Sequence, residues 1–340
     1  MSESFAAGGA VARPCAGEPR AGTPCAGGPR AGGRGGLAEL DPRRALQLAL
    51  AVIWLLDGVL QYQPSMFTSD FPRMLAGTSS GNPAVVASPI TWSATFIDHH
   101  LVAVNAVFAA IQLALGLGIA WRPAVRLALG ASVAWSLGVW WFGEGLGSVL
   151  TGNASPVSGA PGAVILYALL AVLLWPAGRD PAAPFVAGRA VGRGVARGLW
   201  LVLWASLAFF ALQPASRAPR AISGMISGMA AGQPGWLAWA GTRAASALDR
   251  HGLAASVVLA VALAAVAAGP WLPARLARAG IVLALVLAVL IWLAEGLGGL
   301  FTGGGTDPNS GPLLALLAVA FWPAPDPAAP DPAAASREGA

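Results

Sequence analysis

The sequence predicts an all-α integral membrane protein: eight transmembrane helices, arranged as two four-helix repeats of the same orientation, with short interfacial helices in the long outer loops. Composition is the first reason. Hydrophobic residues make up 56% of the 340-residue chain and charged residues only 10%, whereas soluble globular domains carry about 25% charged residues. The second reason is that apolar segments and short polar motifs recur in the two halves of the chain.

Eight apolar segments have the length scale of membrane-spanning helices. They are Ala45–Tyr62, Leu101–Trp121, Val125–Phe142, Ala160–Trp175, Val195–Leu212, Leu253–Ala268, Ala279–Ala294 and Gly311–Trp322. Tryptophan lies at several of their ends, as expected where a span meets the membrane interface. The last segment is short for a full crossing.

The two halves of the chain align with few gaps. Gln63, Glu144, Thr151 and Pro161 in the first half match Gln213, Glu295, Thr302 and Pro312 in the second. Because each unit has an even number of spans, both units have the same orientation. We therefore expect a pseudo-twofold axis along the membrane normal.

The repeat sets the domain boundaries. These are an N-terminal tail (1–43), the first repeat (44–178), a linker (179–194), the second repeat (195–324) and a C-terminal tail (325–340). The N-terminal tail is rich in Pro, Gly, Ala and Arg, which predicts disorder because such a segment cannot bury a core. Cys15 and Cys25 lie in this tail, which offers a metal or redox pair no ordered neighbours.

Arginine placement predicts the topology. With a cytoplasmic N-terminus, fifteen of the twenty arginines lie on the cytoplasmic side, which follows the positive-inside rule and places both termini in the cytoplasm. The chain has no Lys, which indicates a GC-rich bacterial genome and hence a bacterial plasma membrane. No patch of basic and aromatic residues favours nucleic acid, so the expected partner is the lipid bilayer.

The long connections Gln63–His100 and Gln213–His251 then lie on the outer face. Apolar residues at helical spacing predict two short interfacial helices in each connection. Asn82, which precedes Pro83, is predicted to be an N-cap with proline at the first helical position.

Glu144 and Glu295 each end a long apolar segment, where the negative end of the helix dipole disfavours a carboxylate. One interpretation is an ion pair with an external arginine, namely Arg73 in the first half, and Arg243 or Arg250 in the second. Another is an acid that handles protons or binds a ligand. A third is a simple interfacial residue.

Asp57 lies inside the first apolar segment, and Leu207 takes its place in the second repeat. Ionisable groups within spans are costly and are often functional. Two interpretations are proton handling, and a structural polar contact with Gln61, Gln63 or Gln112.

His100 and His251 precede the second and sixth spans at equivalent positions of the repeat. Together with Glu144 and Glu295 they are candidates for two matched metal or proton sites. No spacing fixes two ligands on one helix, however, so the alternative is an interfacial histidine beside a capping aspartate, with no metal.

Two stretches resemble the DoxX-like membrane family, which includes the small subunit of thiosulfate:quinone oxidoreductase. They are NAVFAAIQLALGLGIAWRPAVRLAL at Asn105–Leu129 and GQPGWLAWAG at Gly232–Gly241. The resemblance implies a redox-associated membrane context, with one family unit in each half. The duplication and the paired EGLG motifs depart from a single-unit member, and no catalytic residue of the family maps onto this chain.

Three functions follow as hypotheses. The first is a redox-associated membrane subunit with an outward-facing acidic pocket for a quinone, in which Glu144, Glu295 and Asp57 handle protons and a redox partner protein carries the electrons. The second is a small-solute transporter, although the spans hold few polar groups. The third is a non-catalytic membrane scaffold.

Overall fold

The computed structural model describes residues 41–323, and all regular secondary structure in this range is helical, as predicted. The α-helices are α1 (Pro42–Leu60), α2 (Asp70–Gly77), α3 (Ala84–His99), α4 (Leu101–Ala120), α5 (Val125–Phe142), α6 (Ala163–Leu173), α7 (Val186–Val191), α8 (Arg193–Ala211), α9 (Pro214–Arg217), α10 (Ala221–Ala230), α11 (Gly235–Leu248), α12 (Gly252–Ala268), α13 (Ala274–Ala294) and α14 (Ser310–Ala320). Six 3-10 turns connect them: η1 (Pro64–Phe67), η2 (Arg122–Ala124), η3 (Gly145–Ser148), η4 (Pro156–Ser158), η5 (Gly269–Trp271) and η6 (Gly296–Gly299).

Five helices in the described range are long and apolar enough to cross a membrane. They are Leu101–Ala120, Arg122–Phe142, Arg193–Ala211, Gly252–Trp271 and Ala274–Ala294. About 20 apolar residues in a helix span the hydrocarbon core of a bilayer. These helices indicate a multi-pass membrane protein, whose environment is a lipid bilayer.

The other three predicted spans differ from these five. α1 carries Arg43, Arg44 and Asp57 within its 19 residues. α6 and α14 have only 11 residues each, which is about 16 Å of helix and roughly half the thickness of a hydrocarbon core. The number of eight crossings stays a prediction.

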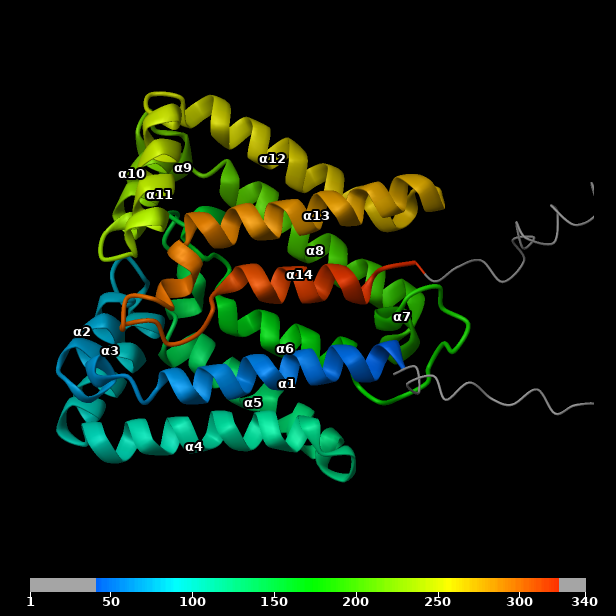
Figure 1. Ribbon diagram of the computed structural model, residues 1–340, viewed down its shortest axis with the longest axis horizontal. Helices are drawn as coiled ribbons and strands as arrows, with labels where there is room; N and C mark the ends of the chain where they lie inside the picture. Colours follow the sequence, from blue (N-terminus) through cyan, green and yellow to red (C-terminus); the bar gives the residue numbers. More distant parts are fainter. Residues whose placement is uncertain (1–40, 324–340) are drawn as a thin grey trace, which may run out of the picture. The chain divides into compact units, whose positions relative to one another are not determined.

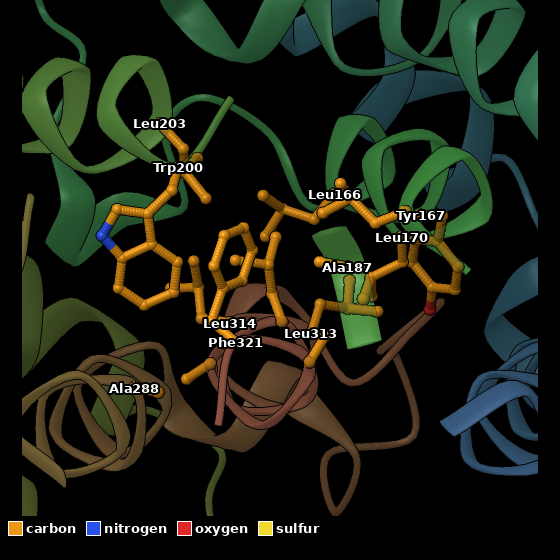
Figure 2. Packing of buried hydrophobic residues seen from close by; sticks show 14 of the residues in the cluster. Leu166, Tyr167, Leu170, Ala187, Trp200, Leu203, Ala288, Leu313, Leu314 and Phe321 are labelled. Carbon is orange, nitrogen blue, oxygen red and sulfur yellow. The ribbon is translucent and has the colours of Figure 1, made fainter. Parts of the chain in front are cut away.

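The short helices α6 and α14 form the centre of the core. They pack against each other, and α14 also packs against α1. Figure 2 shows Leu166 and Leu170 of α6 on one side of this core and Leu313 and Leu314 of α14 on the other. Most residues of both helices are buried, so protein surrounds them along most of their length.

Four helix pairs make the main contacts among the long helices and the two central short ones. α1 packs on α4 and α5 on α6, while α8 packs on α12 and α13 on α14. Figure 1 shows the long helices side by side, with α2, α3, α10 and α11 gathered at one end and α7 at the other. The first residues of α1 and the last of α14 lie at the α7 end.

The two long connections form short helices, as predicted, but one start differs. Helix α3 begins at Ala84 with Pro83 as its N-cap, so the predicted cap at Asn82 is wrong by one residue. The side-chain amide of Asn82 instead donates a 2.9 Å hydrogen bond to the carbonyl of Thr78. Exposed tryptophans on α3 and α11, Trp92 and Trp236, fit the aromatic belt of a membrane interface.

The segment predicted as a linker, 179–194, contains α7, which packs on α6 and α8. Phe185 beside α7 stacks on Phe321 with ring centroids 5.0 Å apart. Cys15, Cys25 and both predicted tails apart from residues 41–43 lie outside the described residues.

Candidate functional site

Each of the two glutamates contacts the first turn of the helix that follows it. The carboxylate of Glu144, just after α5, accepts hydrogen bonds from the backbone N–H of Val164 at 3.1 and 3.3 Å, in the first turn of α6. Oε1 of Glu295, just after α13, accepts a hydrogen bond from the side-chain hydroxyl of Ser310, the first residue of α14, whose backbone N–H is capped by Asn309. A carboxyl group is disfavoured at the end of its own helix but favoured at the start of the next one.

An unusual turn brings each glutamate to this position. Gly145, Leu146 and Gly147 have φ angles of 55°, 54° and 60°, and Gly296, Leu297 and Gly298 repeat this with 60°, 54° and 69°. Glycine takes the left-handed region without strain. At Gly147 a side chain would also overlap the carbonyl of Pro161. The recurring EGLG motif is therefore a reversal that points a carboxyl group at the next helix.

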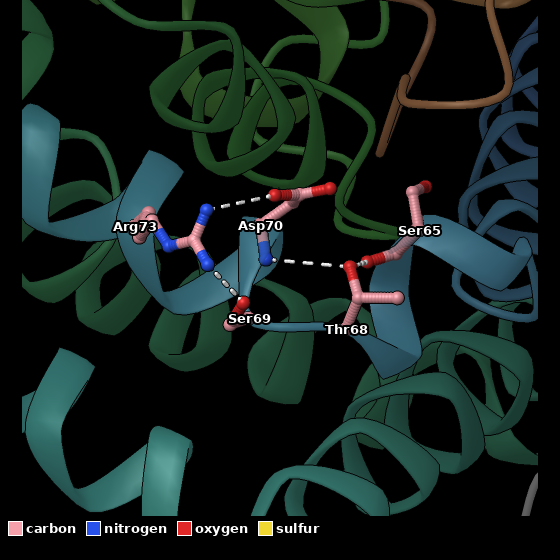
Figure 3. Close-up of polar contacts among 5 residues, drawn as sticks. All are labelled: Ser65, Thr68, Ser69, Asp70 and Arg73. Carbon is pink, nitrogen blue, oxygen red and sulfur yellow. Dashed lines mark hydrogen bonds and ion pairs between the residues drawn. The ribbon is translucent and has the colours of Figure 1, made fainter.

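The ion-pair interpretation of the glutamates is wrong in the part of the chain that the structure describes. Figure 3 shows Arg73 paired with Asp70 on α2, at 3.3 Å. Arg250 pairs with Asp249 at 3.8 Å, and Arg243 lies 5.6 Å from the ring centre of Trp239.

A cavity of about 450 Å³ lies beside Glu144. Its wall combines residues of α1 to α6 with the segment before α14. Aromatic side chains form much of this wall: Trp54, Phe71, Phe108, Trp135, Phe142 and Tyr167. Three acidic residues, Asp57, Glu144 and Asp307, also line it. Two of the three predicted site residues thus meet in one cavity.

Asp57 is 2% exposed, and its Oδ2 accepts a 2.6 Å hydrogen bond from the hydroxyl of Tyr167. Its other oxygen has no hydrogen-bond partner, and the same is true of Oε1 of the neighbouring Gln61, which is 4% exposed. The expected polar contact of Asp57 with a glutamine is therefore replaced by a contact with Tyr167. The sequence signal was available, since Tyr167 is one of only two tyrosines and lies in an apolar segment.

Asp307 was not predicted as a site residue. Its carboxylate accepts hydrogen bonds from the backbone N–H of Asn309 at 2.7 Å and from the hydroxyl of Thr306 at 2.9 Å. The side-chain amide of Gln63, after α1, donates a 2.9 Å hydrogen bond to Gly305 in the same segment. The second half of the chain thus supplies one acidic residue to a cavity that is otherwise built by the first.

Burial raises the pKa values of three of these acids. Burial, with repulsion from Asp307 as the next cause, raises the pKa of Glu144 to about 8. Burial likewise raises the pKa of Glu295 to about 8, against hydrogen bonds from Ser310 that lower it. Burial also raises the pKa of Asp307. Both shifts favour the neutral, protonated form of the glutamates near neutral pH.

Glu295 lies outside the cavity. It is 1% exposed, and its Oε2 has no hydrogen-bond partner. His100 is exposed and lies against the ring of Phe96, and His251 Nδ1 lies 2.7 Å from the carbonyl oxygen of Asp249. Between residues 41 and 323 no group of three or more His, Cys, Asp or Glu is placed to hold a metal ion.

No family model, no curated protein and no solved structure matches the chain. The fold and the site together define a class of protein: a multi-pass helical membrane protein with an aromatic-walled acidic cavity near one end of its helices.

Proposed function

We propose that the protein binds a small, lipid-soluble, quinone-like molecule in this cavity and exchanges protons with it through Glu144 and Asp57. The composition of the cavity wall carries the proposal, because it surrounds one space with aromatic rings and carboxyl groups. A volume of about 450 Å³ also falls in the usual range of small-molecule pockets, about 300–1,000 Å³.

The mouth of the cavity supports entry from the membrane. The lining residues Met74 and Phe142 are 47% and 43% exposed. Ala134, which also lines the cavity, is exposed in the middle of α5. Since α5 belongs to one of the five helices that fit a membrane span, an opening along it faces lipid, and a lipid-soluble molecule can enter sideways.

The acids support proton exchange. A hydroquinone loses protons together with electrons when it is oxidised, and Glu144, with a pKa of about 8, is suited to accept or return a proton near neutral pH. Asp57 offers an oxygen without a partner. In this proposal the electrons pass to a redox partner protein.

We further propose a tandem repeat of a DoxX-like four-helix unit with eight crossings. Three pairs of features support it: α1–α4 corresponds to α8–α12, α5–α6 corresponds to α13–α14, and both EGLG turns aim a glutamate at the next helix. Asp57, Gln112 and Tyr167 align with Leu207, Leu263 and Ala318, so the polar wall belongs to the first repeat. A bacterial plasma membrane with both termini in the cytoplasm would place the cavity toward the outer face.

The test is co-purification followed by titration. The protein is extracted in mild detergent, its bound lipid-soluble molecules are identified by mass spectrometry, and a short-chain hydroquinone is titrated against the fluorescence of the cavity tryptophans. The matched variant is Gly138→Leu, because Gly138 lines the cavity and a side chain there meets no atom within 4 Å. The control is Gly198→Leu on α8, which meets equally open space outside the cavity.

We expect the wild type and Gly198→Leu to bind the hydroquinone, and Gly138→Leu to lose the bound molecule. Equal binding by Gly138→Leu, or no binding by the wild type, would contradict the proposal. The non-catalytic scaffold would then be the better hypothesis. Uptake into proteoliposomes that depends on Glu144 would instead favour the transporter.

A further inference from the structure

The wall of the cavity carries acidic side chains and no basic ones among the described residues. Asp57 comes from α1, Glu144 follows α5, and Asp307 precedes α14, so three separate elements each bring an acid to the same space. An ionised acid that is removed from water costs free energy unless it is paired, so this wall lacks the positive charge that would allow its acids to ionise.

Buried polar atoms at the wall also lack partners. Asp57 and Gln61 are 2% and 4% exposed, and one side-chain oxygen of each accepts no hydrogen bond. A buried acceptor without a hydrogen-bond partner destabilises the folded state. Both side chains line the cavity, so a bound group with N–H donors would supply what they lack.

The aromatic residues suit the same kind of ligand. Trp54, Phe71, Phe108, Trp135 and Phe142 line the cavity together with the acids. The face of an aromatic ring attracts a cation, and this attraction is strongest where water is excluded. Apolar walls also hold the hydrocarbon part of a ligand.

We propose that this cavity also binds a second class of ligand, a lipophilic organic cation such as a protonated amine with an aromatic or alkyl body. Its ammonium group lies between Asp57 and Glu144, and its apolar body lies among the aromatic rings. This inference rests on the proposed function for the place of binding and goes beyond it by adding a cationic class of ligand.

In this proposal, entry of the ammonium group is coupled to the loss of a proton from Glu144. Besides burial, Asp307 from the segment before α14 and Glu295 from the end of α13 raise the pKa of Glu144. Asp57 from α1 and Tyr167 from α6 are the other titratable groups that line the cavity. In the empty cavity Glu144 holds a proton. When the ammonium group enters, Glu144 becomes a carboxylate, its proton leaves to solvent, and the net charge of the cavity is unchanged.

The test compares 4-phenylbutylamine with 4-phenylbutanol, which share an aromatic body and differ in charge. Binding to the full chain in detergent is measured by calorimetry near neutral pH, in two buffers with different heats of ionisation, which counts the protons released. We expect the amine to bind about tenfold more tightly than the alcohol and to release about one proton per molecule bound.

Two variants identify the side chain that releases the proton. Glu144→Gln keeps an oxygen that can accept the hydrogen bond from Val164, so the fold is retained while proton release and the preference for the amine are lost. Glu295→Gln makes the same chemical change outside the cavity and should keep both.

The outcomes separate the inference from the function on which it rests. If the alcohol or a short-chain hydroquinone binds as tightly as the amine, with no proton released, the cation inference is overturned and the binding cavity stands. If no probe binds the wild type, or if Gly138→Leu binds them equally well, both fall.

Discussion

The hydroxyl of Tyr167 donates a 2.6 Å hydrogen bond to Oδ2 of Asp57 and so joins α6 to α1 at the wall of the cavity. Both side chains are 2% exposed. Polar groups in such surroundings are costly to leave unpaired, so this contact connects the stability of the helices with the chemistry of the cavity.

Removal of the Tyr167 hydroxyl should therefore destabilise the protein. We expect Tyr167→Phe to lower the free energy of unfolding by about 1–3 kcal/mol, because it leaves a buried carboxyl oxygen without its donor. Thermal unfolding in detergent measures this, with Tyr62→Phe as the control, since Tyr62 is exposed. If the two variants unfold at the same temperature, the contact does not stabilise the fold.

Stability should fall as pH rises. Folding raises the pKa of Glu144 and of Glu295 from 4.5 to about 8, so the folded state binds more protons than the unfolded state between these values. The stability from the two protonated acids is complete below pH 4.5, declines as pH rises toward about 8, and is lost above it. Thermal midpoints measured across this range check the sign.

Replacing a glutamate by glutamine should weaken the dependence of the thermal midpoint on pH. Glu295→Gln keeps an acceptor for Ser310 and cannot ionise, so it should retain more stability than the wild type at about pH 9. Asp70→Asn, which changes an exposed acid of α2, serves as the control and should follow the wild-type curve. A wild-type midpoint that rises between pH 5 and pH 8 would show that Glu144 and Glu295 are ionised in the folded state.

The left-handed turn should tolerate only glycine at Gly147. Gly147→Ala adds a methyl group at a φ of 60° that overlaps the carbonyl of Pro161. Gly152→Ala is the matched control, because Gly152 has a φ of 73° and open space around it. We expect the control to lose about 1–2 kcal/mol from backbone strain alone and Gly147→Ala to lose clearly more, measured by thermal unfolding. Equal losses would mean that the close approach to Pro161 does not exist.

The segment 300–309 should depend on Gln63. The side chain of Gln63 donates a hydrogen bond to Gly305, and Ser65 donates one to Gly303. Gln63→Ala should speed hydrogen exchange in this segment, as followed by mass spectrometry, because one of its attachments to the first half is lost. Gln213 aligns with Gln63 in the sequence, and its substitution by alanine should leave exchange in 300–309 unchanged. The same exchange rate in both variants would contradict the docking of this segment.

The sequence predicted what depends on local pattern. Apolar length gave the helical membrane class, and the paired EGLG motifs marked Glu144 and Glu295 as special. The sequence did not predict that Glu144 caps the next helix. Its partner Val164 lies twenty residues further along the chain, and only the fold brings the two together.

Other parts of the site were hidden for related reasons. Asp307 lies in a polar segment with no apolar periodicity, and its place at the cavity depends on the packing of one half of the chain against the other. The short length of α6 was also hidden, because hydropathy counts apolar residues from Ala160 onward whereas the helix begins only at Ala163, after Pro161 and Gly162.

The central claim is that a lipid-soluble molecule binds in the cavity. The most direct test is to map the residues that such a molecule contacts. A photoreactive lipophilic amine is cross-linked to the protein in detergent, and the labelled residues are mapped by peptide mass spectrometry in the wild type and in Gly138→Leu. Labels that concentrate at the mouth of the cavity, on the peptides that carry Met74 and Phe142, and disappear in Gly138→Leu are the result predicted here. Labels spread over the lipid-facing helices, identical in both proteins, would contradict it.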